Sequence, residues 1–434
     1  ITNSSSDFLI RSLVQDKDII FKGDDSGTTI TALTLDMSEA GAATFNSTIN
    51  GVGISSDITN FSESMLISND AGTGTLSSAT NNTGFGFEVF DDLTSGVSNT
   101  AFGRKALTVN TTGGSNTAIG MNALVANTTA SNNTAVGKSA LTSNTTGTQN
   151  TAVGSLALDA NTTADSNTAI GYSALSAATT GGNNTAVGRN ALDAATTGNN
   201  NVAVGKDAMD ANTTGDRNVG VGMASLGAMN PSSGTPDMYN TAVGYSSGGG
   251  ITTGQTNTAI GALTLVGTCT ADGNSAVGYN ALNAVTSGAS NSALGVSALA
   301  LNTTGASNVA IGHSTLDANT TGSNNVGVGM GALGANTTAS NNVAVGRNAL
   351  ENNTTGTSNV ALGGNTLAAN SSASNNTAVG FNVLAANSTG ANNTAVGREA
   401  LLSNTEGASN TALGSTALDA NTTGSYNTSV GQAS

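Results

Sequence analysis

The stretch Asn99-Thr100-Ala101-Phe102-Gly103 decides the fold, because its pattern returns at a fixed interval along the chain. It recurs as NTAIG at residues 116–120 and as NTAVG at residues 133–137. The closing glycines keep a 17-residue period from Gly86 to Gly222 and again from Gly244 to Gly431, with one longer step between the two runs. The chain therefore carries 21 repeats and a single five-residue insertion. A fixed period of this length predicts a repeat architecture.

Each position of the repeat, counted from the closing glycine as position 0, carries its own kind of side chain. Position −4 is Asn throughout, position −2 is Ala, Gly or Ser, and position −1 is aliphatic or Phe. Position +4 is nearly always Leu, and a sequence such as Asn-Thr-Thr-Gly at residues 110–113 follows it. The β-branched residues favour a strand over positions −3 to −1, and we expect a second short strand around +3 and +4. No stretch between the breaks is long enough for a stable helix.

These features predict an all-β fold, a parallel β-solenoid of 21 coils in which each coil is one 17-residue repeat. Equivalent positions would then stack at about 4.8 Å per coil. An Asn at the same corner of every coil can hydrogen-bond to its neighbours above and below, and glycine supplies a corner that a Cβ would obstruct. The structural ladder that we expect includes Asn99, Asn116, Asn133, Asn150, Gly103, Gly120, Gly137 and Gly154.

The strand at positions −3 to −1 has two non-polar faces, since one carries Thr or Val with Val or Ile and the other carries only a small residue. A strand of this kind is expected to be buried on both faces. One face can line the interior of its own coil, and the other needs a partner. We therefore expect the chain to associate with copies of itself.

The array occupies only part of the chain. Residues 1–50 contain short β-like runs at 18–21, 31–35 and 43–45 and predict a β-rich segment. Residues 51–81 are expected to form a transition, and residues 82–434 form the array, with the insertion near residues 230–237.

The composition argues against several classes of function. The net charge is −15 and only 11 residues are Lys or Arg, so we expect no nucleic-acid partner, because phosphate binding depends on basic residues. No stretch reaches the ~20 apolar residues of a membrane helix, so we expect no membrane insertion. His313 is the only histidine, acidic residues recur at +5 one or more whole coils apart, and no Cys/His metal spacing exists. We expect no enzyme, no catalytic or metal-binding residues and no cofactor.

Position +1 is the most varied column and holds six of the 11 basic residues. One interpretation is an outward face that contacts a partner. The other is a solvated stripe paired loosely with the acidic +5 column, each pair contributing less than ~1 kcal/mol. The candidate contact residues of this column are Arg104, Lys138, Tyr172, Arg189, Lys206, Arg347 and Arg398.

The insertion is a second candidate contact, since it holds both prolines of the chain, Pro231 and Pro236. Added residues in a solenoid form loops, often on the binding face. The alternative is a surface loop that the fold accommodates and that has no role in binding.

The NTAVG motif, the small-Leu pair and the NTTG turn together resemble the head repeat of trimeric autotransporter adhesins of the YadA type. The longer period with its extra turn is similar to the variant found in bacteriophage tail fibres. Residues 32–36 (ALTLD) and 43–46 (ATFN) also resemble the shaft sequence of such fibres. The resemblance implies a homotrimeric, left-handed β-roll in an extracellular virion tail fibre. It also implies contact with a host surface glycan or protein and with other fibre or virion proteins.

Three alternatives stay open. The chain could be the head of a trimeric adhesin on a bacterial cell surface, which shares the repeat. It could be a monomeric solenoid whose threonine columns at +8 and +9, such as Thr320 and Thr321, bind ice or carbohydrate. It could also be a spacer that carries recognition performed by another protein.

Overall fold

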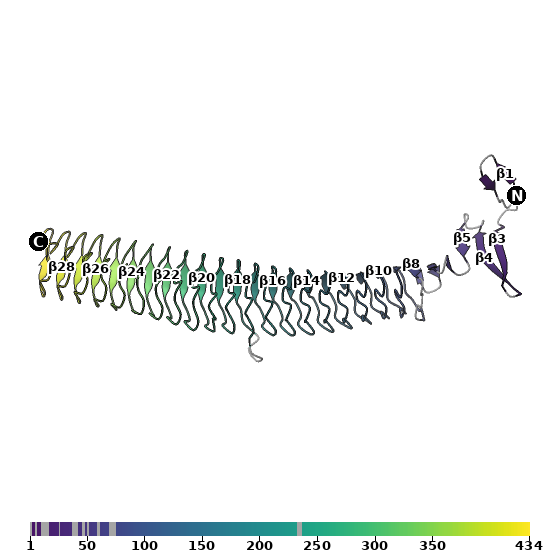
Figure 1. Cartoon of the computed structure of the whole chain (residues 1–434), viewed down its shortest axis with the longest axis horizontal. Coiled ribbons are helices and arrows are strands. Elements are labelled where there is room, and N and C mark those ends of the chain that lie inside the picture. Colours follow the sequence, from purple (N-terminus) through teal and green to yellow (C-terminus); the bar gives the residue numbers. More distant parts are fainter. Residues whose placement is uncertain are drawn as a thin grey trace. The chain divides into compact units, whose positions relative to one another are not determined.

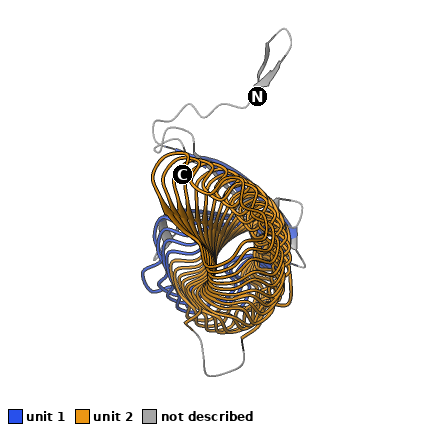
Figure 2. Cartoon of the chain, turned by 90° about the vertical axis from the view of Figure 1, so that its left-hand side faces the viewer, with its two compact units in different colours: residues 1–139 blue, residues 140–434 orange. Residues whose placement is uncertain are grey.

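The chain folds entirely into β-strands and turns wherever its structure is described. The computed structural model describes residues 2–4, 7–9, 17–25, 27–36, 42–45, 48–49, 52–58, 61–68, 75–231 and 237–434. Within these ranges every regular element is a strand. The chain divides into two compact units, unit 1 (Ile1–Ser139) and unit 2 (Ala140–Ser434), which are coloured separately in Figure 2.

Unit 1 starts with strands that pair in antiparallel fashion. They are β1 (Thr2–Ser4), β2 (Asp7–Leu9), β3 (Ile19–Asp25), β4 (Thr28–Asp36), β5 (Ala42–Phe45), β6 (Thr48–Ile49), β7 (Val52–Ile58) and β8 (Phe61–Ser68). Strand β1 pairs with β2, and β4 lies between β3 and β5. Strands β3, β4 and β5 coincide with the three runs expected in the N-terminal β-rich segment. Strand β7 pairs with both β6 and β8, so strands also occupy the stretch expected to be a transition.

The array strands are three residues long and end one position before each closing glycine. In unit 1 they are β9 (Thr83–Phe85), β10 (Thr100–Phe102), β11 (Thr117–Ile119) and β12 (Thr134–Val136). In unit 2 they are β13 (Thr151–Val153), β14 (Thr168–Ile170), β15 (Thr185–Val187), β16 (Val202–Val204), β17 (Val219–Val221), β18 (Thr241–Val243), β19 (Thr258–Ile260), β20 (Ser275–Val277), β21 (Ser292–Leu294), β22 (Val309–Ile311), β23 (Val326–Val328), β24 (Val343–Val345), β25 (Val360–Leu362), β26 (Thr377–Val379), β27 (Thr394–Val396), β28 (Thr411–Leu413) and β29 (Thr428–Val430).

Neighbouring array strands pair in parallel and in register. Within unit 2, Val309 of β22 pairs with Val326 of β23, one coil further along, and the same pattern holds from β13 to β29. Figure 1 shows these strands as successive parallel arrows. Within unit 1, β8 pairs in parallel with β9 and so joins the antiparallel pair of β7 and β8 to the first coil. The predicted fold is confirmed as a parallel β-solenoid of about 21 coils at a 17-residue spacing.

The asparagine at −4 joins each coil to the next and also closes its own coil. The backbone N–H of Asn308 donates to Oδ1 of Asn291 at 3.0 Å, and Nδ2 of Asn308 donates to the carbonyl of Gly322 at 2.8 Å. Oδ1 of Asn308 in turn accepts the N–H of Asn325 at 3.0 Å. The bonds of Asn99 and Asn116 within unit 1 are the same. Each of these side chains is buried, so the ladder runs inside the solenoid.

A second asparagine ladder lies at position +7, and the sequence interpretation missed it. Nδ2 of Asn319 donates to Oδ1 of Asn302 at 2.7 Å and to the carbonyl of Gly322 at 3.0 Å. The carbonyl of Gly322 is the one that Asn308 also binds. Two buried amides therefore converge on one carbonyl and fix the turn that follows position +7.

The closing glycine is required by both its backbone angle and its surroundings. Gly103 has φ of +129°, and a Cβ there would lie 2.8 Å from the carbonyl carbon of Gly120 in the next coil. Gly120 and Gly137 have φ of +134° and +141°. L-residues rarely adopt this conformation. Any side chain would both strain the corner and push the coils apart.

The expected second strand around +3 and +4 does not form. These positions lie in consecutive turns, and Leu316 at +4 has φ of 54°, in the left-handed region. This conformation costs an ordinary residue roughly 1–2 kcal/mol. Leu316 is completely buried, and full burial of a leucine contributes about 1.5–3 kcal/mol, which offsets the strain. Strand propensity failed here because burial of the leucine, rather than its backbone preference, sets the conformation.

The array strands turn one side inward and the other outward. In β22 the middle residue Ala310 is completely buried, whereas Val309 is half-buried and Ile311 is exposed. In the next coil, a Cβ added to Gly327 would meet the side chains of Thr315 and Leu316. The small residue at −2 thus packs against the buried +3 and +4 side chains, and the residues at −3 and −1 face outward.

Adjacent glycines at Gly363 and Gly364 give a direct test of the corner. Gly363 has φ of +135° and its added Cβ would collide with the carbonyl of Gly380, whereas a Cβ on Gly364 would lie 3.5 Å from the Phe381 ring, an ordinary contact. We predict that Gly363→Ala lowers the free energy of unfolding by more than about 1 kcal/mol. Gly364→Ala, the matched control, should leave it unchanged or slightly higher. Equal effects in urea unfolding followed by circular dichroism would contradict this role.

Candidate functional site

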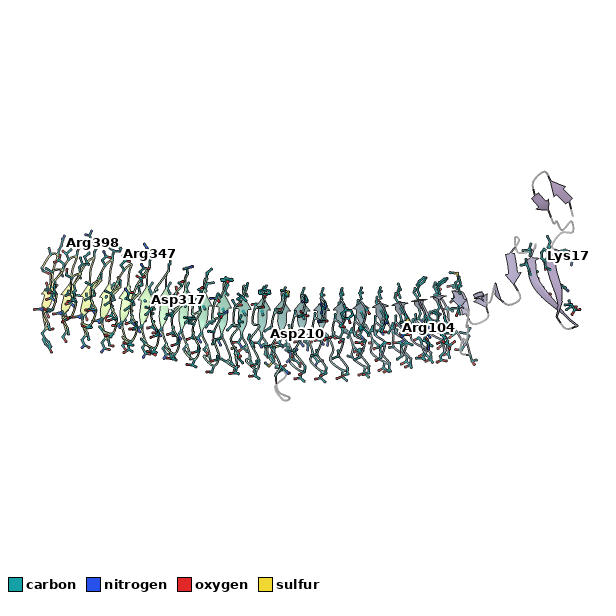
Figure 3. All side chains as sticks on the ribbon, in the orientation of Figure 1. Lys17, Arg104, Asp210, Asp317, Arg347 and Arg398 are labelled. Carbon is teal, nitrogen blue, oxygen red and sulfur yellow. The ribbon has the colours of Figure 1, made fainter. Side chains whose placement is uncertain are left out.

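The +1 column follows the corner glycine and is exposed at every candidate residue. The side chains that lie exposed there are Arg104, Lys138, Tyr172, Arg189, Lys206, Arg347 and Arg398. In Figure 3, Arg347 and Arg398 project from the upper edge of unit 2. Each of these residues is brought next to the +1 residues of the adjacent coils in its own unit. The column is therefore accessible, as a contact surface would have to be.

Two cations of this column pair with carboxylates at +2 rather than with the acidic +5 column. Nζ of Lys206 lies 3.1 Å from Oδ2 of Asp207, and Nη2 of Arg398 lies 2.9 Å from Oε2 of Glu399. The expectation of +5 partners is wrong for these two residues. The buried +3 and +4 side chains separate +1 from +5, whereas +2 is adjacent. Such exposed pairs contribute little to stability.

Neighbouring residues of the +1 column also contact one another. The Arg104 guanidinium lies over the ring of Phe87 in the preceding coil of unit 1, 5.8 Å from the ring centroid. A cation above an aromatic face is attracted by about 0.5–1 kcal/mol at an exposed site. The stacking of coils therefore places long side chains of different chemistry side by side.

Three carboxyl groups of the acidic +5 column are partly buried, and their pKa is raised. Burial raises the pKa of Asp159 and of Asp317 above the usual value. Burial also raises the pKa of Asp210, and the nearby charges of Asp207 and Asp193 add to this effect. The column thus carries carboxyl groups that hold their protons more tightly than exposed ones.

A hollow of about 310 Å³ opens beside this column in unit 2. It is lined by Ser314, Asp317, Gly331, Gly334, Ala335, Glu351 and Asn352. It exists because one coil has glycine at both +2 and +5, so that two side chains are missing from the same place. Asp317 and Glu351, from the two flanking coils, line it on either side.

The other residues that could carry chemistry are isolated. His313 is exposed in the +1 column. Cys269 is completely buried, its Sγ lies 3.6 Å from the carbonyl oxygen of Ala271, and burial raises the pKa of its thiol. Within the described ranges, no three His, Cys, Asp or Glu residues are grouped so that they could hold a metal ion.

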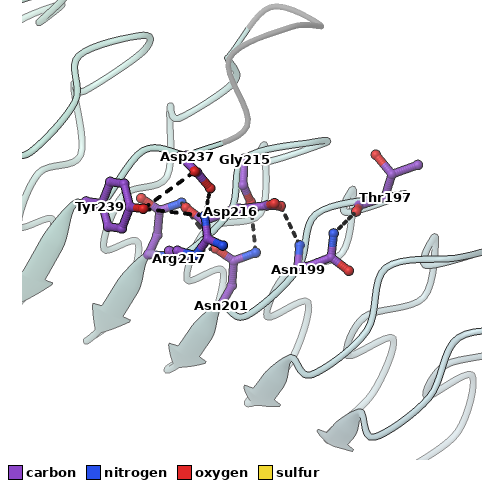
Figure 4. A network of polar contacts seen from close by, with 9 residues as sticks. Thr197, Asn199, Asn201, Gly215, Asp216, Arg217, Asp237 and Tyr239 are labelled. Atoms are coloured by element: carbon purple, nitrogen blue, oxygen red, sulfur yellow. Dashed lines mark hydrogen bonds and ion pairs between the residues drawn. The ribbon is translucent and has the colours of Figure 1, made fainter.

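The base of the insertion is held by a polar network that the sequence interpretation did not identify. Arg217 forms an ion pair with Asp237, and its guanidinium lies 5.6 Å from the centre of the Tyr239 ring (Figure 4). Asp216 forms a β-bridge with Asp237 and accepts the N–H of Asn199 at 2.6 Å. The signal available in the sequence was the pair of opposite charges on either side of the insertion.

The two prolines of the insertion have different outcomes. Pro231 is buried, and a Cβ added to Gly215 would lie only 3.1 Å from the Cγ of Pro231. It packs against the preceding coil instead of offering a surface. Pro236 lies outside the described residues.

The two threonine columns differ in what their hydroxyls do. Oγ1 of Thr320 at +8 donates to the carbonyl of Thr337 in the next coil at 3.0 Å, and Thr303 does the same to Thr320. The hydroxyls at +8 therefore serve the stacking of the coils. Thr321 at +9 is exposed.

The outward face of the array strands is a regular surface that repeats in every coil of unit 2. Position −1 is aliphatic in every strand from β13 to β29, and its residues are half-buried or exposed. Exposed members include Ile170, Val243, Ile260, Leu294, Ile311, Val345, Leu362, Val396 and Leu413. Position −3 adds Thr, Val or Ser. This outward face, defined by positions −3 and −1, carries no charged residue in unit 2.

The partly buried carboxyl groups make the stability of the chain depend on pH. Because burial and neighbouring charges raise the pKa of Asp210, the folded chain binds this proton more tightly than the unfolded chain. Its contribution to stability therefore grows as the pH falls from above the raised pKa towards the usual 3.8. We predict that Asp210→Asn raises the thermal midpoint at neutral pH and reduces the gain in stability on acidification. Asp419→Asn, at an exposed position of the same column, is the control. A pH profile of Asp210→Asn identical to that of the parent chain would contradict the prediction.

Known proteins do not add to this picture. No protein-family model, curated protein or solved structure matches the chain. Among the described residues there is also no helix with the length and hydrophobicity needed to cross a bilayer. The surfaces of the coil itself are therefore the basis for assigning a function.

Proposed function

We propose that the chain is a structural, non-enzymatic fibre protein: a segment of an extracellular bacteriophage tail fibre that assembles as a homotrimer and contacts the host cell surface. The observation that carries the proposal is the outward face of the array strands. It is free of charge over all 17 strands of unit 2, with an aliphatic residue at −1 and Thr, Val or Ser at −3. Soluble chains rarely leave so large an apolar surface exposed to water, and such surfaces mark sites of association.

The size of the outward face suits a stable interface. Strands spaced at ~4.8 Å make a face about 80 Å long in unit 2, and three residues at ~3.3 Å make it about 10 Å wide. The area is on the order of 800 Å², which is what each partner buries in a standard protein–protein interface. A second copy of the chain offers the same face at the same repeat, so that coil can match coil along the whole length.

The chemistry of the outward face also favours a copy of the chain as its partner. Burying Val, Ile and Leu side chains contributes about 25 cal/mol for each Å² removed from water. Because the face has no charged residue, burial requires no charge to be desolvated. We infer three copies, rather than two, because the repeat resembles those of trimeric fibres and adhesins.

The proposed role combines rigidity with multivalency. Every coil is tied to the next by buried asparagine bonds, so unit 2 is a stiff element. Three copies would present each surface column three times, which converts weak contacts into useful avidity. A trimeric adhesin head on a bacterial surface is the runner-up, since the coil would serve it equally. The 17-residue period and the NTTG turn favour the tail fibre.

Light scattering on the purified chain tests the assembly. We predict a mass three times the 42.0 kDa of one chain that persists on dilution. Val328→Lys with Val345→Lys places two charges in the outward face and should reduce the mass to that of one chain. Thr321→Lys, at the exposed +9 column, is the matched control, and its mass should stay three times that of one chain. A parent chain with the mass of a single copy would refute the trimer.

A further inference from the structure

The +1 column loses its charged residues over five successive coils of unit 2. The residues there are Met223, Tyr245, Ala262, Tyr279 and Val296. The column resumes with Lys206 on one side and His313 on the other. Tyr245 is 51% exposed and Tyr279 is 54% exposed. Two tyrosines with half of their surface in water therefore lie on an uncharged strip of a column that is otherwise rich in cations.

The spacing of the two tyrosines is fixed by backbone hydrogen bonds. The N–H of Leu263 donates to the carbonyl of Tyr245 at 3.0 Å, and the N–H of Asn280 donates to the carbonyl of Ala262 at 3.1 Å. The N–H of Ser297 continues the series to the carbonyl of Tyr279 at 2.9 Å. Each bond connects one coil to the next, so Tyr245 and Tyr279 are two coil heights apart, about 9.5 Å. The small Ala262 separates them and leaves the space between the two side chains open.

Polar side chains border the strip at position +2 in three of the five coils. Ser246, Asn280 and Ser297 are half-buried there, and Nδ2 of Asn280 lies 3.5 Å from Oγ of Ser297. These groups can donate and accept hydrogen bonds from a ligand that lies along the strip. In ligand sites, a few fixed polar groups beside an apolar surface set the orientation of the ligand.

The ligand that fits this arrangement is a linear sugar chain. A pyranose ring presents a face of C–H groups that packs on an aromatic ring, and its hydroxyls remain free for hydrogen bonds. In an extended β-1,4-linked glycan, alternate sugars present the same face, and one sugar is about as long as one coil is high. Two aromatic side chains that are two coils apart can therefore hold alternate sugars, with the intervening sugar over Ala262.

We propose that Tyr245 and Tyr279 form a stacking platform for an uncharged, linear β-1,4-linked glycan that runs along the coils of unit 2. The inference rests on the proposed attachment function and names the class of its ligand. The absence of charge from position +1 over these five coils favours a neutral glycan over an acidic one or a charged peptide. The remaining exposed tyrosine of this column, Tyr172, lies between Ser155 and Arg189 and has no aromatic partner two coils away, so it lacks the paired geometry.

The experiment is a binding titration of the full chain with cellohexaose and chitohexaose, with maltohexaose as the α-linked control. Binding is followed by isothermal titration calorimetry and by tyrosine fluorescence, which is the dominant emission because the chain has no tryptophan. We expect at least one β-1,4-linked hexasaccharide to bind and maltohexaose not to bind. Tyr245→Ala and Tyr279→Ala should each weaken binding roughly tenfold, the loss of one aromatic contact. Tyr172→Ala should leave the affinity unchanged.

The outcomes separate this inference from the assembly proposal. Failure of both β-1,4-linked hexasaccharides to bind, or equal binding by maltohexaose, would overturn the platform. Undiminished binding by the two alanine variants would also overturn it. The mass of the same sample is measured by light scattering, so a trimer that binds no glycan refutes only the platform. A single chain that binds in the predicted manner refutes only the trimer.

Discussion

The hydrogen bonds of the asparagine at −4 are the constraint on which the rest of the structure depends. One side chain accepts the N–H of the next coil, donates to the carbonyl that ends its own coil, and lies completely out of water. A buried donor or acceptor left without a partner costs about 1–3 kcal/mol, and each such amide satisfies several groups at once. No other side chain of similar size offers both an acceptor and two donors at this corner. The residue is therefore the same in every repeat, although the exposed columns vary freely.

Once the coils are tied at this corner, the other positions follow from the small height of one coil. The closing glycine is needed because the backbone of the next coil occupies the space of a Cβ, and the leucine at +4 accepts a left-handed backbone because its burial outweighs the strain. The residue at −2 must be small because a larger side chain at Gly327 would meet the side chains of Thr315 and Leu316 in the preceding coil. The columns at −4, −2, +3, +4 and +7 thus fill the interior, and the outward strand face and the +1 column stay accessible to water.

The sequence predicted the parts of the fold that depend on periodicity. The repeat, the parallel solenoid and the structural places of Asn99 and Gly103 all follow from identical residues at fixed intervals, because stacked coils bring identical residues together. Features that depend on the path inside one coil could not be predicted in this way. The turns around Leu316 and the convergence of Asn308 and Asn319 on one carbonyl require a backbone that is far from strand geometry. Of the candidate site, the exposure of the +1 column was predictable, whereas its pairing with +2 carboxylates and the burial of Pro231 depended on that same path.

Amide hydrogen exchange at Asn325 tests the ladder most directly, since its N–H donates to Oδ1 of Asn308 at 3.0 Å. In Asn308→Ala this donor loses its partner, and we predict that the N–H of Asn325 exchanges faster by at least one order of magnitude, a change of more than about 1.4 kcal/mol in the free energy of local opening. In Thr321→Ala, a change at an exposed position of the same coil, exchange at Asn325 should equal that of the parent chain. Protection of Asn325 that survives Asn308→Ala would show that the coils stack without the asparagine ladder and would contradict the account.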